Sequence, residues 1–352
     1  MKGIILHAGH GTRLKPLTYG RPKQLLPIAN KPMSQFGLEL LKNSGVDEIA
    51  IIIGGNNAEK VKEFYGNGER FGVKISYIFQ DSPKGISHAI GLCKEFVGKE
   101  KFIVFLGDNI LIKDISNNIR EFESSDSDAK IFLCEVDNPS QFGIADVKYG
   151  KIIKIIEKPE DPPTNFAIIG VYLLTPKIFE IIKNLKPSWR NELEITDALQ
   201  KFLEQENKIS FDVITNYWKD TGTVDDIIDA NNILILEMEN KFEGEKEGEV
   251  ELIGKVIVGR NSEIGRSVSI EGPVLIGENS KIGSNVKIGP NVSIGDNCII
   301  ENCAIDNSII MNNCKINQVK KITQSIIGYN SEIYNSTESS FILCEDSKIE
   351  LS

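Results

Sequence analysis

The 352-residue sequence has few of the side chains that metal centres and covalent catalysis commonly use. It contains three histidines, the last at position 88, and its six cysteines form no Cys-x-x-Cys pair. A zinc site is therefore not expected, and the thiols at positions 93, 134, 298, 303, 314 and 344 are predicted to be buried. No serine or cysteine with an adjacent base suggests a covalent intermediate.

The chain also lacks long apolar runs and an excess of positive charge. The apolar run at its start is too short for a signal peptide or a membrane span, and no later run approaches that length. The formal net charge of −10 argues against a general nucleic-acid or anionic-membrane binder. We therefore expect a cytoplasmic protein without membrane or nucleic-acid partners, in which local cations would hold any anionic substrate.

The first third of the chain alternates between short apolar segments and amphipathic ones. Residues 3–6, 48–53, 74–78 and 101–106 are predicted strands, and residues 34–44, 58–66 and 85–96 are predicted helices. This alternation predicts an α/β fold with βαβ units and a Rossmann-like, mostly parallel sheet. Ligands bind at the carboxyl ends of the strands in such sheets, where Leu6, Gln80 and Asp108 stand.

From position 250 the sequence repeats with a period of six. Valine or isoleucine occupies every sixth position, and glycine follows six of the eight, which are Val258, Ile264, Ile270, Ile276, Ile282, Ile288, Ile294 and Ile300. Such a hexapeptide period predicts a parallel β-helix in which one residue per hexad lines the core. The period slips at Asp306 and resumes loosely afterwards.

Near the N-terminus, a loop of small residues is followed by cations. Small residues at positions 8, 9 and 11 would let backbone N–H groups approach a polyphosphate, whose charge Arg13 and Lys23 could neutralise. A tight turn with ordinary surface cations is the alternative. Neither the dinucleotide-binding pattern Gly-x-Gly-x-x-Gly nor the P-loop pattern is complete. His7 and His10 are interpreted as neutral loop residues rather than catalysts.

The string from Gly3 to Met33 resembles the signature of the sugar-phosphate nucleotidylyltransferases, in which Gly-Thr-Arg-Leu precedes Pro-Lys and then Lys-Pro. Within that family it is most similar to the long-form thymidylyl enzymes, and the resemblance covers nearly the whole chain. It implies a nucleotidyltransferase catalytic domain over 1–240, a linker over 241–249 and a left-handed, hexapeptide-repeat parallel β-helix over 250–352. It also implies a Mg²⁺-dependent transfer of a nucleotidyl group from dTTP to glucose 1-phosphate by direct in-line attack, giving dTDP-glucose and pyrophosphate.

The resemblance assigns roles residue by residue. As catalytic residues it implies Arg13, Lys23, Asp108 and Asp220, the two aspartates being the Mg²⁺ ligands. As nucleotide-binding residues it implies Leu6, Ala8, Gly9, Gly11, Thr12, Arg13, Gln24, Gln80 and Gly85. As sugar-phosphate-binding residues it implies Gly143, Glu157, Lys158, Asn165, Tyr172 and Glu194. Several of these positions also have purely structural interpretations, because an Asp after a strand can form a turn and a Glu–Lys pair can end a surface strand.

Two glutamines bear on the choice of nucleotide. The Gln80 amide offers a donor and an acceptor, so it can pair with a pyrimidine edge. Gln24 matches a position that contacts the nucleotide sugar in thymidylyl enzymes, where uridylyl relatives prefer Glu, and this favours dTTP. The alternatives are UTP, or another sugar 1-phosphate such as N-acetylglucosamine 1-phosphate.

Two further alternatives belong to other classes. A non-catalytic assembly subunit would tend to lose the Lys and Asp positions that this chain keeps. A bifunctional acyltransferase would commonly need a His base in the β-helix, and no His follows position 88. We therefore interpret residues 250–352 as a structural and oligomerisation domain and expect a homo-oligomer.

Overall fold

A computed structural model describes residues 1–7, 11–55, 58–215, 217–337 and 339–350. The chain forms two compact units. The first comprises Met1–His10 and Ser34–Asp220, and the second comprises Gly11–Met33 and Thr221–Ser352. Residues 11–33 thus group with the C-terminal part of the chain rather than with the strands that flank them in sequence. Among the described residues, no helix has the length and apolar character needed to cross a membrane.

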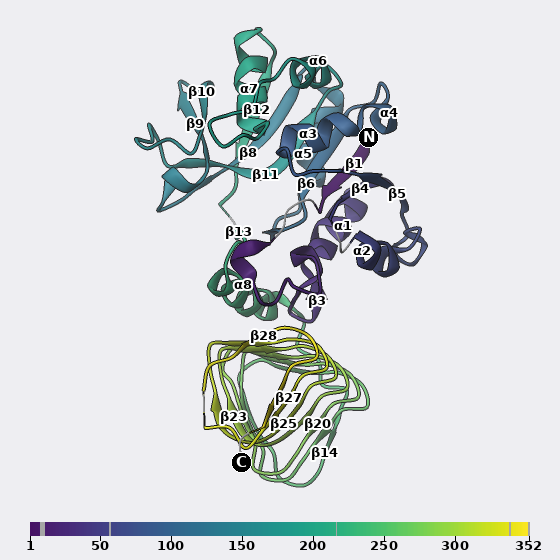
Figure 1. Cartoon of the computed structure of the whole chain (residues 1–352), viewed down its shortest axis with the longest axis vertical. Coiled ribbons are helices and arrows are strands. Elements are labelled where there is room, and N and C mark those ends of the chain that lie inside the picture. Colours follow the sequence, from purple (N-terminus) through teal and green to yellow (C-terminus); the bar gives the residue numbers. More distant parts are fainter. Residues whose placement is uncertain (8–10, 56–57, 216, 338, 351–352) are drawn as a thin grey trace. The chain divides into compact units, whose positions relative to one another are not determined.

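A nine-stranded sheet forms the centre of the first unit. Its main path runs β10-β9-β11-β6-β1-β4-β5, and β8 joins β11 to β12. The strands are β1 (Lys2–Leu6), β4 (Glu48–Ile53), β5 (Lys74–Phe79), β6 (Phe102–Leu106), β8 (Ala129–Glu135), β9 (Gly143–Lys148), β10 (Lys151–Glu157), β11 (Phe166–Leu174) and β12 (Ile209–Val213). Figure 1 shows β1 between β4 and β6, with which it pairs in parallel. The predicted α/β fold is confirmed, and β5, β4, β1 and β6 pair in parallel as expected. The pairings of β11 with β6, β8 and β9 and of β9 with β10 are antiparallel.

Helices connect these strands. They are α1 (Met33–Asn43), α2 (Ala58–Tyr65), α3 (Ile86–Leu92), α4 (Lys94–Val97), α5 (Ser116–Ser124), α6 (Ile178–Lys183) and α7 (Ile195–Glu204). The predicted helix over 85–96 is split at Cys93, whose backbone N–H bonds to the Ile90 carbonyl and tightens the last turn of α3. Short 3₁₀ turns occur at Glu69–Phe71 and Pro139–Gln141.

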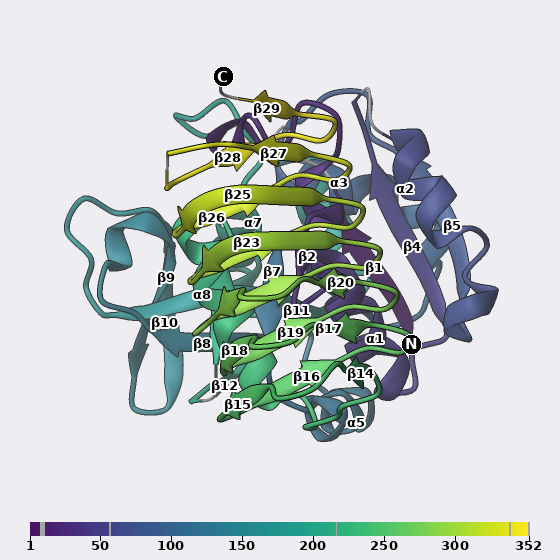
Figure 2. The ribbon, with the colours of Figure 1, turned by 90° about the horizontal axis from the view of Figure 1, so that it is seen from below.

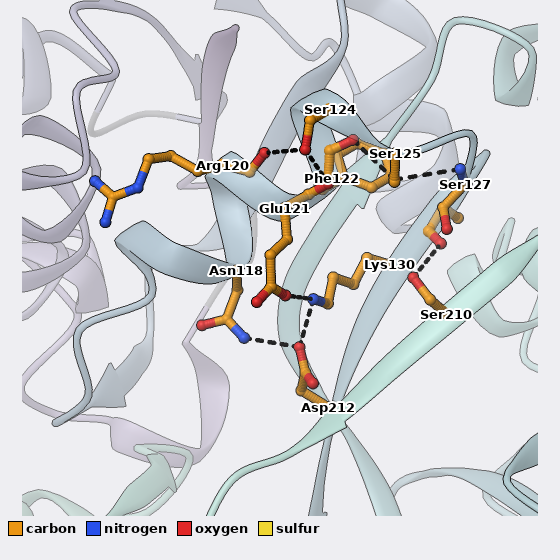
Figure 3. A network of polar contacts seen from close by, with 11 residues as sticks. Asn118, Arg120, Glu121, Phe122, Ser124, Ser125, Ser127, Lys130, Ser210 and Asp212 are labelled. Atoms are coloured by element: carbon orange, nitrogen blue, oxygen red, sulfur yellow. Dashed lines mark hydrogen bonds and ion pairs between the residues drawn. The ribbon is translucent and has the colours of Figure 1, made fainter.

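A buried charged network ties three of these elements together (Figure 3). Lys130 of β8 is only 6% exposed. Its Nζ lies 2.6 Å from Asp212 Oδ2 on β12 and 3.0 Å from Glu121 Oε2 on α5. Asn118 Nδ2 donates to the same Asp212 oxygen at 2.7 Å. A buried ammonium needs such partners because an unpaired charge in the interior is costly.

The second unit consists of a stack of coils over 242–350, here called the coil stack, together with α8 (Val224–Glu237) and the hairpin of β2 (Pro27–Ile28) and β3 (Lys31–Pro32). Ten strands form one sheet of the stack: β14 (Glu245–Lys246), β15 (Glu251–Ile253), β17 (Glu263–Ile264), β18 (Ser269–Glu271), β20 (Lys281–Ile282), β21 (Lys287–Ile288), β23 (Ile299–Ile305), β25 (Lys315–Ile322), β27 (Glu332–Tyr334) and β29 (Lys348–Glu350). Six form another: β16 (Val256–Val258), β19 (Val274–Ile276), β22 (Val292–Ile294), β24 (Ser308–Ile310), β26 (Ser325–Ile327) and β28 (Ile342–Leu343).

Strands in successive coils pair in parallel, and Figure 2 shows β23, β25, β27 and β29 as successive layers. Val256 pairs with Val274 and Val274 with Val292, so one coil takes three of the predicted hexads. Coils shorten where the period slips, since Val292 pairs with Ser308. All eight predicted core positions belong to the buried core, none more than 2% exposed.

The segment 241–249, for which the sequence predicts a linker, belongs to this architecture. Its β14 pairs in parallel with β17, and Phe242 forms a bridge with Val258. The segment is rich in charged residues and glycine, which indicates exposed side chains but says nothing about backbone pairing. Its exposed side chains are therefore compatible with the first layer of the coil stack.

Candidate functional site

A cavity of about 180 Å³ lies at the carboxyl ends of β1, β5 and β6. Its lining residues are Leu6, Gln80, Pro83, Gly85, Ile86, Ala89, Leu106, Asp108 and Glu192. Four of the predicted site residues, Leu6, Gln80, Gly85 and Asp108, therefore line one cavity although three separate segments of the chain supply them. The location agrees with the rule that open α/β sheets bind ligands at this edge.

Gly85 allows two segments of the cavity wall to pack closely. A Cβ at this position would lie 2.6 Å from both the backbone nitrogen and oxygen of Leu193, and the φ of Gly85 is +100°. Leu193 N–H donates to the Lys84 carbonyl at 2.8 Å, and Ser87 N–H donates to the Leu193 carbonyl at 3.0 Å. The segment after β5 is thereby joined by its backbone to the segment that carries Glu194.

The two predicted metal ligands stand at the ends of neighbouring strands. β13 (Trp218–Asp220) pairs antiparallel with β7 (Asn109–Leu111), with Asp220 opposite Asn109, the residue after Asp108. Asn109 Nδ2 donates to Asp108 Oδ1 at 3.1 Å. Asn109 Oδ1 accepts from Trp218 Nε1 at 2.7 Å, so one amide joins β7 to β13.

Three of the predicted site carboxylates act electrostatically on the buried phenol of Tyr172. Its pKa is raised well above the ordinary value, first by burial and then by the negative charges of Glu157, Asp108 and Asp220. These three side chains come from β10, from the end of β6 and from β13. The tertiary structure thus places them around one tyrosine of β11.

A second cluster of carboxylates is held by an arginine to which the sequence analysis assigns no role. Arg190 Nη1 lies 3.2 Å from Glu157 Oε1 and 3.4 Å from Glu194 Oε1. Thr196 Oγ1 donates to Glu157 Oε2 at 2.9 Å, and Ser188 Oγ donates to Glu194 Oε1 at 2.9 Å. The only sequence signal for Arg190 was its place beside the Glu-Leu-Glu-Ile-Thr-Asp string.

Burial is the largest influence on the Glu157 carboxyl and raises its pKa. The Thr196 hydrogen bond opposes this effect, the nearby Glu194 charge adds to it, and the cations of Lys158 and Arg190 oppose it. The arrangement is a polar, anionic cluster that can accept hydrogen bonds from hydroxyl groups while two cations stand beside it.

Two of the remaining predicted sugar-phosphate residues, Gly143 and Lys158, adjoin this cluster. Gly143 lies opposite Glu157 in the β9–β10 pair, and a Cβ there would lie 2.4 Å from Thr196 Cγ2. Lys158 follows directly with a φ of +41°, and its N–H donates to the Phe142 carbonyl at 3.0 Å. The Phe142 ring packs edge-on against Trp218 of β13 with 5.6 Å between centroids. Asn165 is exposed on the bend before β11.

The predicted triphosphate residues of the second unit lie in two short 3₁₀ turns, Thr12–Leu14 and Lys23–Leu25. Gly11 has a φ of +57°, and a Cβ there would lie 3.3 Å from Lys23 Cβ. A Cβ at Gly222 would lie 3.0 Å from Arg13 Nη2, so the guanidinium packs over that glycine. Thr12 and Arg13 are exposed, whereas Gln24 is 1% exposed. Ala8, Gly9 and His10 lie outside the described residues.

The same segment is anchored to the coil stack. Arg21 Nη2 lies 3.3 Å from Glu345 Oε2, and its guanidinium carbon lies 4.3 Å from the centroid of the Tyr329 ring. Asn30 Nδ2 donates to the Ile294 carbonyl at 2.6 Å. Residues 11–33 are therefore held at Arg21 and again at the β2–β3 turn.

His7 directly follows β1 and has a neutral side chain. Burial lowers its pKa to about 3, against the opposing influence of Asp108. The imidazole is 3% exposed and packs edge-on against Tyr65, with ring centroids 5.7 Å apart. The interpretation of His7 as neutral is confirmed, but it lies within the packed interior rather than in an open loop. The six cysteines carry free thiols, of which Cys134 and Cys344 are half-buried and the others are buried.

Comparisons with known proteins show which family the chain resembles. Residues 2–236 match the family model described as nucleotidyl transferase, and residues 270–351 match the model described as GMPPB C-terminal domain. The low-salt glycan biosynthesis nucleotidyltransferase Agl11 of Haloferax volcanii is 45% identical over 73% of this chain and 72% of its own length. The glucose-1-phosphate thymidylyltransferase of Streptomyces antibioticus is 37% identical over 100% of this chain and 99% of its own length.

A solved structure is also similar. It is a Bacillus anthracis protein assigned as glucose-1-phosphate thymidylyltransferase, in complex with sucrose. It superposes with a TM-score of 0.64 at 40% identity, covering 69% of this chain and 98% of that protein. The similarity of fold therefore extends over about the length of chain that the first family model matches.

Proposed function

Because the chain belongs to the nucleotidyl transferase family, we propose that it transfers a nucleotidyl group from dTTP to glucose 1-phosphate. A phosphate oxygen of the sugar phosphate attacks the α-phosphorus of dTTP, the bond to the β-phosphate oxygen breaks, and pyrophosphate leaves as dTDP-glucose forms. The near full-length similarity to the Streptomyces antibioticus protein of that name supports this choice. The observation that carries the proposal is the cavity at the sheet edge, which is lined by Gln80, Gly85 and Asp108.

The side chains of the proposed site bind, orient and neutralise rather than form covalent bonds. Arg13 and Lys23 would stabilise the charge on the triphosphate, because phosphoryl-group transfer depends on positioning and on charge neutralisation. Lys158 would orient the sugar phosphate. Glu157 and Glu194 would accept hydrogen bonds from sugar hydroxyls, since their oxygens already face the donors of Thr196, Ser188 and Arg190.

Asp108 and Asp220 fit a magnesium ion. Mg²⁺ is usually held by one or two carboxylates, with phosphate oxygens and water completing its shell. The two proposed ligands lie at the end of β6 and on β13, whose Asp220 pairs opposite Asn109, the residue after Asp108. Among the described residues, no cluster of three or more His, Cys, Asp or Glu side chains could hold a metal ion. When bound, the ion would offset negative charge on the phosphates. We further propose that the coil stack is a left-handed β-helix and that the protein forms a homo-oligomer.

UTP is the second candidate nucleotide, because the Gln80 amide would meet the same imide edge on thymine and uracil. The test is a panel of dTTP, UTP, dCTP, ATP and GTP against glucose 1-phosphate and N-acetylglucosamine 1-phosphate, with pyrophosphate release as the measurement. We expect the highest kcat/KM for dTTP with glucose 1-phosphate. Absence of pyrophosphate release from every combination would reject the proposal and favour a non-catalytic assembly subunit.

The metal assignment has its own test. Asp108→Asn and Asp220→Asn should each lower turnover by orders of magnitude, because each removes a charge that would hold the ion. Asp126→Asn is the matched control, since Asp126 is exposed and paired with Lys208. Chelation should abolish activity and added Mg²⁺ should restore it. Near-normal turnover of both site variants would remove the assignment.

A further inference from the structure

A histidine outside the predicted site contacts the glutamine at the cavity. Gln80 follows β5 and is 3% exposed, and its Nε2 lies 2.9 Å from Nδ1 of His88 on α3. An amide nitrogen can only donate, so this contact pairs with the His88 tautomer that carries its proton on Nε2 and accepts at Nδ1. Half-burial and then the charge of Lys84 lower the pKa of His88, against the opposing charge of Asp81, which favours the neutral imidazole, the only form in which a ring nitrogen can accept.

The position of His88 is set by the backbone around it. Ser87 N–H donates to the Leu193 carbonyl, and Ser87 Oγ donates to the Glu194 carbonyl at 2.9 Å. Gly85 packs directly against Leu193 at the start of the same helix. Ser87, the residue before His88, thus ties the first turn of α3 to Leu193 through its backbone and to Glu194 through its side chain. The imidazole is therefore held in place beside the Gln80 amide.

An acceptor at this place favours one of the two orientations of the amide, because the flipped amide would need the other His88 tautomer, with the proton on Nδ1. The nitrogen and oxygen of a glutamine side chain have nearly the same shape, so an unrestrained amide can present either to a ligand. With Nε2 held by His88, Gln80 presents Oε1 as an acceptor and retains one hydrogen on Nε2 as a donor. Thymine and uracil match this pattern through N3–H and an adjacent carbonyl. Cytosine has an acceptor at N3 and a neighbouring amino group, which match only the flipped amide.

We infer that His88 is a specificity-determining residue: as its Nε2–H tautomer it favours one orientation of the Gln80 amide, and so favours nucleotides whose pyrimidine N3 carries a proton over cytosine nucleotides. The inference rests on the proposed function, because it assigns the base to the cavity that Gln80 lines. It adds a residue whose effect is on the choice between bases rather than on the transfer step.

Two isosteric substitutions test the inference. His88→Asn places an amide where Nδ1 stood, and this amide can flip together with Gln80, so both orientations become available. His88→Asp places only acceptor oxygens there and keeps Gln80 in its present orientation. Any general effect of the new charge on triphosphate binding cancels in a ratio, because dTTP and dCTP carry the same triphosphate. The measurement is therefore kcat/KM for dTTP divided by kcat/KM for dCTP, on the full-length chain with glucose 1-phosphate.

We expect the ratio to fall about tenfold in His88→Asn, the equivalent of roughly one hydrogen bond, and to stay within about twofold of the wild type in His88→Asp. His88→Leu, which offers no acceptor, should behave like His88→Asn. Equal ratios in the Asn and Asp variants would overturn the inference, and so would an unchanged ratio in His88→Leu. If the wild-type chain releases pyrophosphate with no nucleotide, the proposed function itself fails, and that outcome is distinct from an active enzyme with unaltered selectivity.

Discussion

The hydroxyl of Ser293 donates a hydrogen bond to Oδ1 of Asn231 at 2.8 Å, and both side chains are fully buried. The same oxygen accepts from the backbone N–H of Ala29 at 2.9 Å. One side-chain oxygen therefore joins α8, the β2–β3 turn and strand β22 of the coil stack. The segment that carries Arg13 and Lys23 is thus built into the same unit as the coils, and the coils contribute to its position.

Asn231→Ala should destabilise the second unit. It removes an acceptor that serves two buried donors, and leaving such groups unsatisfied costs about 1–3 kcal/mol. The free energy of unfolding, measured by denaturant titration, should fall by that amount. The neighbouring Asn232→Ala is the matched control, because Asn232 is half-buried and its Nδ2 makes a 3.3 Å contact with Asn307. A loss in Asn232→Ala as large as in Asn231→Ala would contradict the prediction.

Arg190→Gln should change the response of the protein to pH. The folded-state pKa of Glu157 is raised, chiefly by burial, so its contribution to stability is present below the unfolded pKa and lost as the pH rises through the folded pKa. Removing the guanidinium 3.2 Å from its oxygen raises that pKa further. The variant should therefore lose more stability than the wild type as the pH rises above the ordinary range of a carboxyl pKa.

The same substitution should move the acid limb of kcat/KM for the sugar phosphate to higher pH, because hydroxyl binding needs the ionised carboxylate. Arg260→Gln is the control, since Arg260 pairs with Glu278 on the exposed surface of the coil stack. Superimposable pH profiles for Arg190→Gln and the wild type would show that Glu157 does not govern the limb.

Gly85→Ala should impair both packing and nucleotide binding. The new Cβ would meet the Leu193 backbone at 2.6 Å, in a backbone conformation that costs a non-glycine residue about 1–3 kcal/mol. Displacing Leu193 would open the cavity wall, so KM for the nucleotide should rise. Gly98→Ala is matched, because Gly98 also has a positive φ but its Cβ would meet nothing within 4 Å. A similar KM in both variants would argue against the close-packing account.

Asp212→Ala should destabilise the first unit more than simultaneous replacement of Asp212 and its ion-pair partner Lys130. It would leave the Lys130 ammonium, whose side chain is 8% exposed, with the exposed Glu121 as its only remaining ion-pair partner among the described residues. Breaking a fully buried pair on one side costs about 3–5 kcal/mol, and the cost here should be smaller because the Asp212 side chain is 35% exposed. Replacing both partners by apolar groups is often nearly neutral. Thermal unfolding of the Lys130→Met/Asp212→Ala double variant should therefore occur above that of Asp212→Ala alone. Asp126→Ala, which removes an exposed partner of Lys208, should change stability by less than about 1 kcal/mol.

The sequence by itself determined the features that depend on local pattern. Strands β1, β4, β5 and β6 and helices α1 and α2 lie within one residue of their predicted bounds, because apolar periodicity reflects which side of a segment is buried. The eight core positions of the coil stack follow from the same reasoning, since a fixed period repeats one local environment. The motif strings likewise pointed to the nucleotidyl transferase family before any contact was known.

Only the tertiary structure decided which distant residues meet. The sequence does not state that Arg190 joins Glu157 to Glu194, that His88 contacts Gln80, or that the β2–β3 turn rests on Asn231. The sequence also did not predict the split of the helix at Cys93 or the pairing of β14 with β17. Both features are backbone hydrogen bonds, whereas composition describes side chains. Contacts between residues far apart in the chain depend on how whole elements pack, and no spacing within a single segment records that packing.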